Sequence, residues 1–262
     1  HLITEDDSPV DSFLSEKNQR LLTDSLYSSR PSELTSDRFI AAANVGIFSL
    51  LYEPAIVPDV FLSLDVQMPE SWEAREHRSY MLWEFGKPPE VVIEIVSHTP
   101  GKEAGEKLKR YERIGVDYYV IFDPYRHLND NLLTVFERRA GRLQPMNRPW
   151  FFTAVGVGVM LWNGVYEGQR GMWLRWCDRE GKPILTGAEL AQQERQRAEQ
   201  ERQHAEQERQ RAEQERQHAE QERQRAEQER QRAEQEATAR ATAEAEVARL
   251  RTELDRLQRG QS

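Results

Sequence analysis

The sequence contains a single cysteine, Cys177, among its 262 residues. One cysteine excludes a framework of disulfides within the chain and any zinc site built on paired cysteines. Sparse cysteine is also typical of proteins that work in reducing compartments, so we expect a cytoplasmic location.

Long hydrophobic runs are missing as well. The longest strongly apolar stretch, residues 151–162, spans 12 residues and includes two glycines, whereas a helix needs about 20 apolar residues to cross a bilayer. The first residues, HLITEDDSPVDSF, are acidic and lack the basic-then-apolar order of a secretory signal. We therefore expect neither a membrane span nor a signal peptide.

Basic residues do not outnumber acidic ones, and the net charge is -9. This balance argues against a protein coated in positive surface for nucleic acid. It leaves room for a local nucleic-acid groove, because an acidic enzyme can hold a phosphate with a metal ion and a few lysines.

Proline and tryptophan disappear near Thr186: all 12 prolines and all 6 tryptophans precede it. From residue 191 onward the chain holds 17 acidic residues and 15 arginines, with glutamine and alanine making up most of the rest. The change in composition predicts a globular domain over 12–187 and a separate charged segment over 188–262. The leading residues 1–11 are expected to be a disordered N-terminus.

The charged segment repeats a seven-residue unit, ERQRAEQ or ERQHAEQ, from Glu194 to Gln235. Seven is the period of a coiled coil, with alanine at a and glutamate at d. The apolar positions strengthen only at the end, at Val247, Leu250, Leu254 and Leu257. We predict one long helix over 188–259 that forms a homo-oligomer through its last leucines, or else a solvated single helix that spaces the domain.

The globular domain shows an α/β pattern of strand, strand, helix and strand. A helix is expected over residues 12–27, followed by strands in VFLSL, VVIEI and DYYVIF. A helix between the last two strands should end at Gly115. Two hairpins are expected near the end of the domain, with Gly141 and Gly181 in their turns, and residues 71–87 are interpreted as a lid or loop.

Glu94 is a carboxylate inside an apolar run, EVVIEIVS. A buried carboxylate without a partner is costly, so this side chain should meet a cation. Asp59 stands at the head of the preceding strand and Lys107 on the following helix. Two carboxylates that converge with a lysine at one end of a sheet favour a Mg²⁺ site, where the metal acidifies a bound water and the lysine stabilises charge on a phosphate.

These residues, in VPDV, VVIEIVSHT and EKLKRYERIGVDYYVIFDP, resemble the bacterial Uma-type restriction endonuclease family within the PD-(D/E)XK nuclease superfamily. The resemblance covers roughly residues 12–187 and implies a restriction-endonuclease-like mixed β-sheet flanked by helices. It also implies an endonuclease that hydrolyses DNA phosphodiester bonds with Mg²⁺, or with Mn²⁺ in its place.

Carried over residue by residue, Asp59 and Glu94 match the motif acids and would bind the metal. The lysine expected two residues after the glutamate is replaced by Val96. The family typically moves this lysine to the next helix, where Lys107 matches, so the predicted catalytic set is Asp59, Glu94 and Lys107.

Three weaker candidates accompany that set. Glu103 stands four residues before Lys107 where the family often has aspartate, Lys109 is the alternative lysine, and Glu16 is the acidic residue of the first helix that could complete such a site. Two other functions stay open: a non-catalytic interaction or adaptor protein that oligomerises through its coiled coil, and a metal-dependent hydrolase of another phosphodiester.

Overall fold

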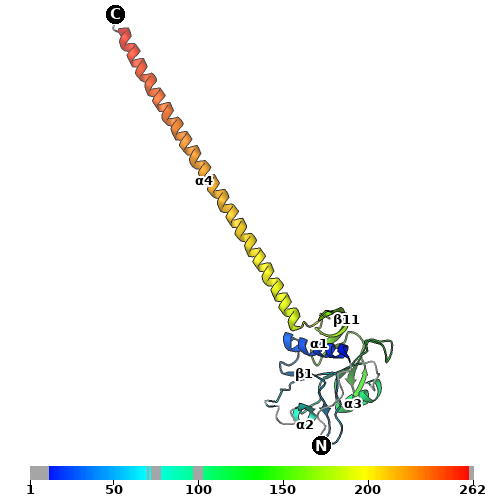
Figure 1. Ribbon diagram of the computed structural model, residues 1–262. Helices are drawn as coiled ribbons and strands as arrows, with labels where there is room; N and C mark the ends of the chain where they lie inside the picture. Colours follow the sequence, from blue (N-terminus) through cyan, green and yellow to red (C-terminus); the bar gives the residue numbers. More distant parts are fainter. Residues whose placement is uncertain (1–11, 70, 72–77, 97–102, 260–262) are drawn as a thin grey trace. The chain divides into compact units, whose positions relative to one another are not determined.

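A computed structural model describes residues 12–69, 71, 78–96 and 103–259 of the chain (Figure 1). The expected N-terminal segment 1–11 lies outside these residues. The elements follow in the order α1 (Phe13–Ser29), β1 (Phe39–Ala43), β2 (Ile47–Phe48), β3 (Val60–Leu64), β4 (Tyr80–Met81), α2 (Leu82–Phe85), β5 (Val91–Ile95), η2 (Glu103–Lys107), α3 (Leu108–Ile114), β6 (Tyr118–Phe122), β7 (Leu133–Arg139), β8 (Arg142–Pro145), β9 (Phe151–Phe152), β10 (Val157–Tyr166), β11 (Gln169–Cys177) and α4 (Gly187–Arg259).

The central sheet has six strands in the order β1-β3-β5-β6-β7-β8. Strands β5 and β6 run parallel and the other neighbours in this sheet run antiparallel. Each residue of β3, β5 and β6 is buried, which is why these strands appear in the sequence as unbroken apolar runs. The predicted mixed α/β sheet with flanking helices is confirmed.

Apolar side chains cover both faces of this sheet. On one face, leucines of α1 and residues of the three-stranded sheet β9-β10-β11 form a core with alternate residues of β3, β5 and β6. On the other face, α3 and the small β2-β4 sheet close a second core that includes Val92, Val96 and Tyr111. Because side chains alternate along a strand, Glu94 points toward this second core.

The second hairpin differs from its prediction. Strand β11 pairs along its whole length with β10, through a turn at Glu167 and Gly168. The turn at Gly181 exists, with φ of 79°, but beyond it only one isolated bridge joins Cys177 to Pro183. Around this bridge Asp178 and Ile184 donate to the carbonyls of Lys182 and Trp176. The carbonyl of Ile184 accepts from the side chain of Arg175 at 2.7 Å, and the strand expected after Gly181 does not form.

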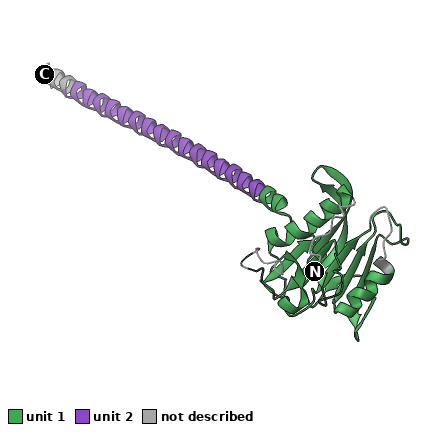
Figure 2. Cartoon of the chain, turned by 60° about the horizontal axis from the view of Figure 1, so that its bottom comes forward, with its two compact units in different colours: residues 1–193 green, residues 194–262 purple. Residues whose placement is uncertain are grey.

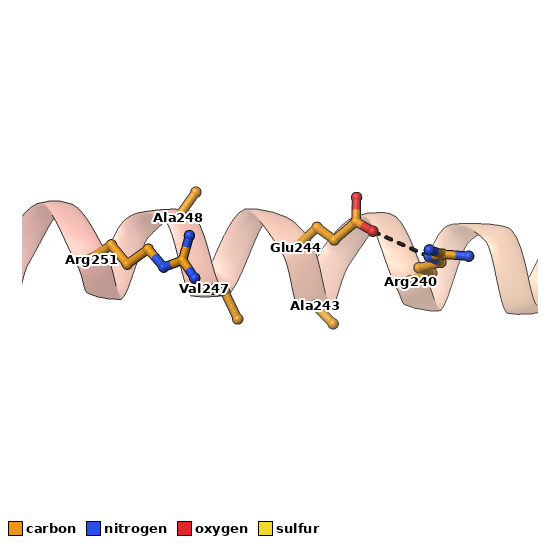
Figure 3. Close-up of a pocket in the computed structure, with 6 residues that line it drawn as sticks. All are labelled: Arg240, Ala243, Glu244, Val247, Ala248 and Arg251. Atoms are coloured by element: carbon orange, nitrogen blue, oxygen red, sulfur yellow. Dashed lines mark hydrogen bonds and ion pairs between the residues drawn. The ribbon is translucent and has the colours of Figure 1, made fainter.

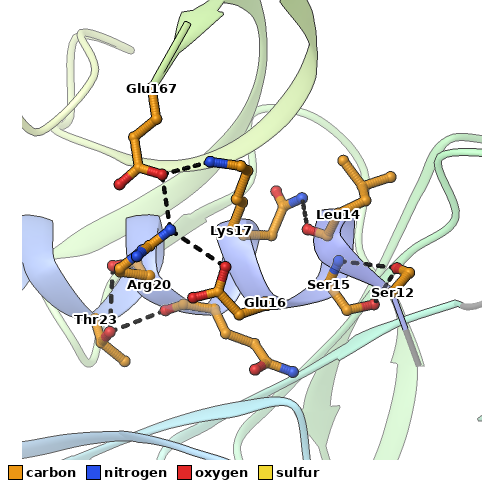
Figure 4. A network of polar contacts seen from close by, with 10 residues as sticks. Ser12, Leu14, Ser15, Glu16, Lys17, Arg20, Thr23 and Glu167 are labelled. Atoms are coloured by element: carbon orange, nitrogen blue, oxygen red, sulfur yellow. Dashed lines mark hydrogen bonds and ion pairs between the residues drawn. The ribbon is translucent and has the colours of Figure 1, made fainter. Parts of the chain in front are cut away.

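Helix α1 is tied to the domain by caps and by ion pairs (Figure 4). The Ser12 side chain accepts the N–H of Ser15 at 3.1 Å and caps the first turn. Further along, Lys17 and Arg20 both donate to the carboxylate of Glu167, at 2.5 and 2.7 Å. The turn between β10 and β11 is therefore held against the first half of α1.

The chain separates into two units, residues 1–193 and 194–262 (Figure 2). Helix α4 starts within the first unit, where Thr186 and Glu189 form a reciprocal capping box: Thr186 Oγ1 accepts the N–H of Glu189 at 3.3 Å, and Glu189 Oε2 accepts the N–H of Thr186 at 2.8 Å. Arg175, only 2% exposed, donates to both carboxylate oxygens of Glu189 at 2.8 and 2.6 Å. The first turn of α4 is thus fixed by buried contacts.

The predicted long C-terminal helix is confirmed over its 73 residues. Its residues from 191 to 252 are exposed. Among the helices that the structure describes, α4 included, none combines the length and the apolar character that crossing a membrane requires.

Candidate active site

The pairing of β3 with β5 sets the geometry of the candidate site. Val60 lies opposite Ile93 and Phe61 opposite Val92. Extending this antiparallel register by one residue places Asp59 opposite Glu94. Two acidic residues 35 positions apart in the sequence thereby become cross-strand neighbours, close enough for their side chains to interact.

Asp59 is half-buried and both of its carboxylate oxygens accept hydrogen bonds. The N–H of Ile95 donates to Oδ2 at 2.7 Å, and the side-chain amide of Gln19 donates to Oδ1 at 2.7 Å. Gln19 is in turn held by Asn44, whose side-chain amide donates to Gln19 Oε1 at 3.0 Å. Helix α1 and β5 together fix the orientation of this carboxylate.

Glu94 is 2% exposed. The hydroxyl of Tyr111 donates to Oε1 at 2.6 Å, and the ammonium of Lys107 donates to Oε2 at 2.8 Å. Both donors come from the segment that follows β5. Lys107 is the cation that the sequence required for this buried charge, and its own side chain keeps 30% exposure.

The electrostatics of the site follow from burial. Burial raises the pKa of Glu94 to about 8; the ammonium of Lys107 works against this shift and the carboxylate of Asp59 adds to it. Burial likewise raises the pKa of Asp59, although the N–H of Ile95 and the amide of Gln19 favour its charged form. A further cation beside these two carboxylates would relieve their repulsion.

Lys107 is positioned by an unusual turn. Residues Glu103–Lys107 form a π-helical turn that leads directly into α3, and Gly115 ends α3 with φ of 104°. A π turn bonds residues five apart, so Glu103 and Lys107 are not related as they would be in a regular helix. Such turns occur often at functional sites, although the side chain of Glu103 lies outside the described residues.

The structure brings Asp59, Glu94 and Lys107 together and leaves two weaker candidates elsewhere. Lys109 is exposed on α3. Glu16 lies on the exposed side of α1, where it accepts a hydrogen bond from Arg20 at 3.2 Å. The residue of α1 that reaches Asp59 is Gln19, on the next turn.

Two members of the site were missed in the sequence. Gln19 is 4% exposed and belongs to a buried polar row of α1 with Ser15 and Asn18. Polar residues on the face that also carries Leu22 were the available signal, since buried polar groups need partners. Tyr111 was not singled out in the sequence, because only its hydroxyl distinguishes it from an apolar core residue.

The donor set fits a metal ion that keeps much of its own water. In the described part of the chain, no group of three or more histidine, cysteine, aspartate or glutamate side chains is arranged to hold a metal. The available ligands are the carboxylates of Asp59 and Glu94. Mg²⁺ is commonly bound by one or two carboxylates plus waters and substrate phosphate, so these residues suit it.

Comparison with known proteins agrees with this geometry. The chain matches the model of the Uma2 family, described as "Putative restriction endonuclease", over residues 5–152. That range is more than half of the 262 residues and contains the three site residues. A comparison with curated proteins found no match. The description points to a nuclease-type function, and the chain belongs to the Uma2 restriction endonuclease family.

Proposed function

We propose that this protein is a Mg²⁺-dependent endonuclease that hydrolyses phosphodiester bonds in DNA. The observation that supports the proposal best is the meeting of Asp59, Glu94 and Lys107 at the end of two buried strands. In that place a buried glutamate has a lysine and an aspartate beside it. A purely structural role would not require two carboxylates to share one poorly solvated position.

Asp59 and Glu94 would hold the ion, Mg²⁺ or Mn²⁺. When bound, the ion supplies an acidified water and neutralises a phosphodiester oxygen. The hydrogen bonds from Ile95 and Gln19 to Asp59, and from Tyr111 to Glu94, hold the ligand oxygens in place before substrate arrives.

The proposed role of Lys107 is to stabilise charge on the phosphate of the substrate. Its side chain is 30% exposed while its ammonium contacts Glu94. A cation at this position stabilises the charge that develops on the phosphate during the displacement. The net charge of -9 means that attraction by the whole protein does not draw DNA in, so binding depends on these local cations.

The test is cleavage of a supercoiled plasmid and of circular single-stranded DNA by the full chain, with Mg²⁺ or Mn²⁺ and with EDTA as control. Asp59→Asn, Glu94→Gln and Lys107→Met are compared with Lys109→Met, which alters an exposed lysine of the same helix. We expect metal-dependent cutting by the unmodified protein and by Lys109→Met, and loss of cutting in the other three.

Activity that survives in both Asp59→Asn and Glu94→Gln would overturn the proposal. Absence of cutting by folded protein under every condition would instead favour the non-catalytic interaction function.

A further inference from the structure

Toward its C-terminal end, α4 carries a row of exposed apolar side chains among the residues that the structure describes. Val247 is 48% exposed and Leu250 is 55% exposed. A shallow hollow on the helix surface lies between Arg240, Ala243, Glu244, Val247, Ala248 and Arg251 (Figure 3). Ala243 and Val247 project to the same side of the helix there. In water such a row is unfavourable and marks a contact surface.

We propose that this row, Ala243, Val247 and Leu250, binds a second copy of the chain in a parallel, two-stranded coiled coil that excludes the repeats before Arg240. The proposal is independent of the nuclease activity.

The heptad positions support two strands. Counting in sevens places Val247 and Leu254 at a, and Ala243, Leu250 and Leu257 at d. A β-branched residue at a together with leucine at d favours a parallel dimer over larger assemblies. The helix around Val247 and Leu250 is regular and exposed on all sides, so it is available for this packing without rearrangement.

Charge selects the parallel arrangement. Glu246 occupies a g position and Arg251 the following e position. In a parallel pair, g of one chain faces the following e of the other, so Glu246 meets Arg251 of the partner subunit. In an antiparallel pair g faces g, and the g positions here, Glu246 and Glu253, would repel each other.

The same heptad register keeps the seven-residue repeats between Glu194 and Gln235 out of the proposed coiled coil. Between Glu194 and Gln235 every d position is glutamate, as at Glu208, and the flanking e and g positions are arginine or histidine, as at Arg209 and His204. A parallel pair would set two carboxylates against each other in each d layer, without apolar burial to offset their desolvation. Arg240 still places a charge at an a position, and the layers with apolar residues at a and d begin after it.

The test is the molar mass of the full chain, measured by light scattering during gel filtration over a concentration series. We expect twice the 30.7 kDa of one chain at the higher concentrations. Leu250→Glu should give the mass of one chain, because it places a charge at a d position. Ala248→Glu adds the same charge at the neighbouring outer position b and should remain a dimer.

Reversing one charge of the proposed pair between Glu246 and Arg251 tests whether the two helices run parallel. Glu246→Arg and Arg251→Glu should each weaken the dimer by about twofold to fivefold, and the double variant should restore it. Engineered cysteines test which part of α4 forms the coiled coil. Ala243→Cys should form an intermolecular disulfide on mild oxidation, whereas Glu208→Cys in the repeats should not. Cys177 does not interfere, because it is buried and burial raises the pKa of its thiol to about 11.

A chain that stays monomeric throughout the series would overturn the proposal, as would an Ala248→Glu variant that dissociates like Leu250→Glu. A stronger dimer in Glu246→Arg alone would show an antiparallel pair, and cross-linking through Glu208→Cys would show that the repeats belong to the coil. Either result would contradict the arrangement proposed here.

Discussion

Glutamate plays opposite parts in the two units of this chain. Glu94 in the domain is 2% exposed and contacts Tyr111 and Lys107, which lie 17 and 13 residues away. Glu244 in the tail is 71% exposed and pairs with Arg240, one helical turn before it. A local, solvated pair contributes little, whereas a buried carboxylate with distant partners is tolerated only where it serves a purpose. Environment, and not residue type, therefore singles out Glu94 as the candidate functional glutamate.

The largest effect should come from making the same substitution in both environments. Glu94→Gln should lower the rate of DNA cleavage by about a thousandfold, because it removes a proposed metal ligand and the charge that Lys107 faces. Glu244→Gln should leave the rate unchanged. Single-turnover cleavage of a labelled duplex measures both, and equal activity of the two variants would contradict the contrast.

The free energy of unfolding of Glu94→Gln separates a role of Glu94 in the chemistry from a role in the fold. Glutamine can still accept the hydrogen bond of Tyr111, and Lys107 is near enough to solvent to be hydrated. We expect the free energy of unfolding to stay within about 1 kcal/mol of the unmodified value. A large loss of stability would mean that Glu94 serves the fold more than the chemistry.

The next contrast compares the cleavage rates of variants at two lysines, Lys107 and Lys109. Lys107→Met should lower the cleavage rate about 100-fold, because one charge near the phosphate is lost. Lys109→Met, two residues away and exposed, should behave as the unmodified protein does. Cleavage time courses at saturating Mg²⁺ check both, and a similar loss in the two variants would show that only the general charge of the helix matters.

Glutamine is also present in both units. Gln19→Ala removes the amide that orients Asp59 and should reduce activity about tenfold to 100-fold, with a higher Mg²⁺ concentration needed for half the maximal rate. Gln196→Ala in the exposed helix is the matched change and should have no effect. A rate loss without any change in Mg²⁺ dependence would argue against positioning of a metal ligand.

Glu189 tests a half-buried ion pair that serves the fold. Glu189→Gln leaves the 2% exposed Arg175 without its charge partner and should cost about 1–3 kcal/mol of unfolding free energy at pH 7. Urea titration measures this difference, and Glu229→Gln in the repeats is the control with no expected change.

The pH dependence of that difference has a definite sign. Burial alone would raise the pKa of Glu189, but the hydrogen bonds from Arg175 and Thr186 outweigh it and hold the pKa below its ordinary value of 4.5. A lowered pKa stabilises the fold above pH 4.5, and the contribution is lost as the pH falls through the folded-state value. The gap between the unmodified protein and Glu189→Gln should therefore narrow below pH 4.5, and a gap that widens there would refute this explanation.

The smallest effect should follow the largest deletion. Both apolar cores consist of residues up to Ile184. The domain of a chain ending at residue 193 should therefore have the same free energy of unfolding as in the full chain, within about 0.5 kcal/mol, when measured by urea titration. Loss of the domain transition in this shortened chain would show that the tail supports the domain.

The sequence predicted whatever depends on local pattern. Apolar runs located β3, β5 and β6, the glycine at position 141 located the β7-β8 turn, and the seven-residue period located α4. The meeting of Asp59, Glu94 and Lys107 was also predicted, because strand ends and the following helix converge at one edge of a sheet. Their catalytic and metal-binding roles stay predictions.

What the sequence did not reveal depends on lateral packing. Gln19 reaches Asp59 across 40 residues, and no periodicity indicates which helix lies beside which strand end. Strand β10 was missed for a related reason: two glycines interrupt its alternation, and its pairing with β11 is what makes it a strand. The π turn before α3 likewise results from how the chain returns from β5, and its residues have no special composition.

The capping box at the start of α4 has a kinetic consequence. Starting a helix in water is unfavourable, because several residues must be ordered before the first hydrogen bond forms, whereas each added residue extends it at little cost. Thr186, Glu189 and the buried Arg175 already hold the first turn once the domain has folded. The domain thus acts as the nucleus from which a highly charged, apolar-poor sequence propagates as helix.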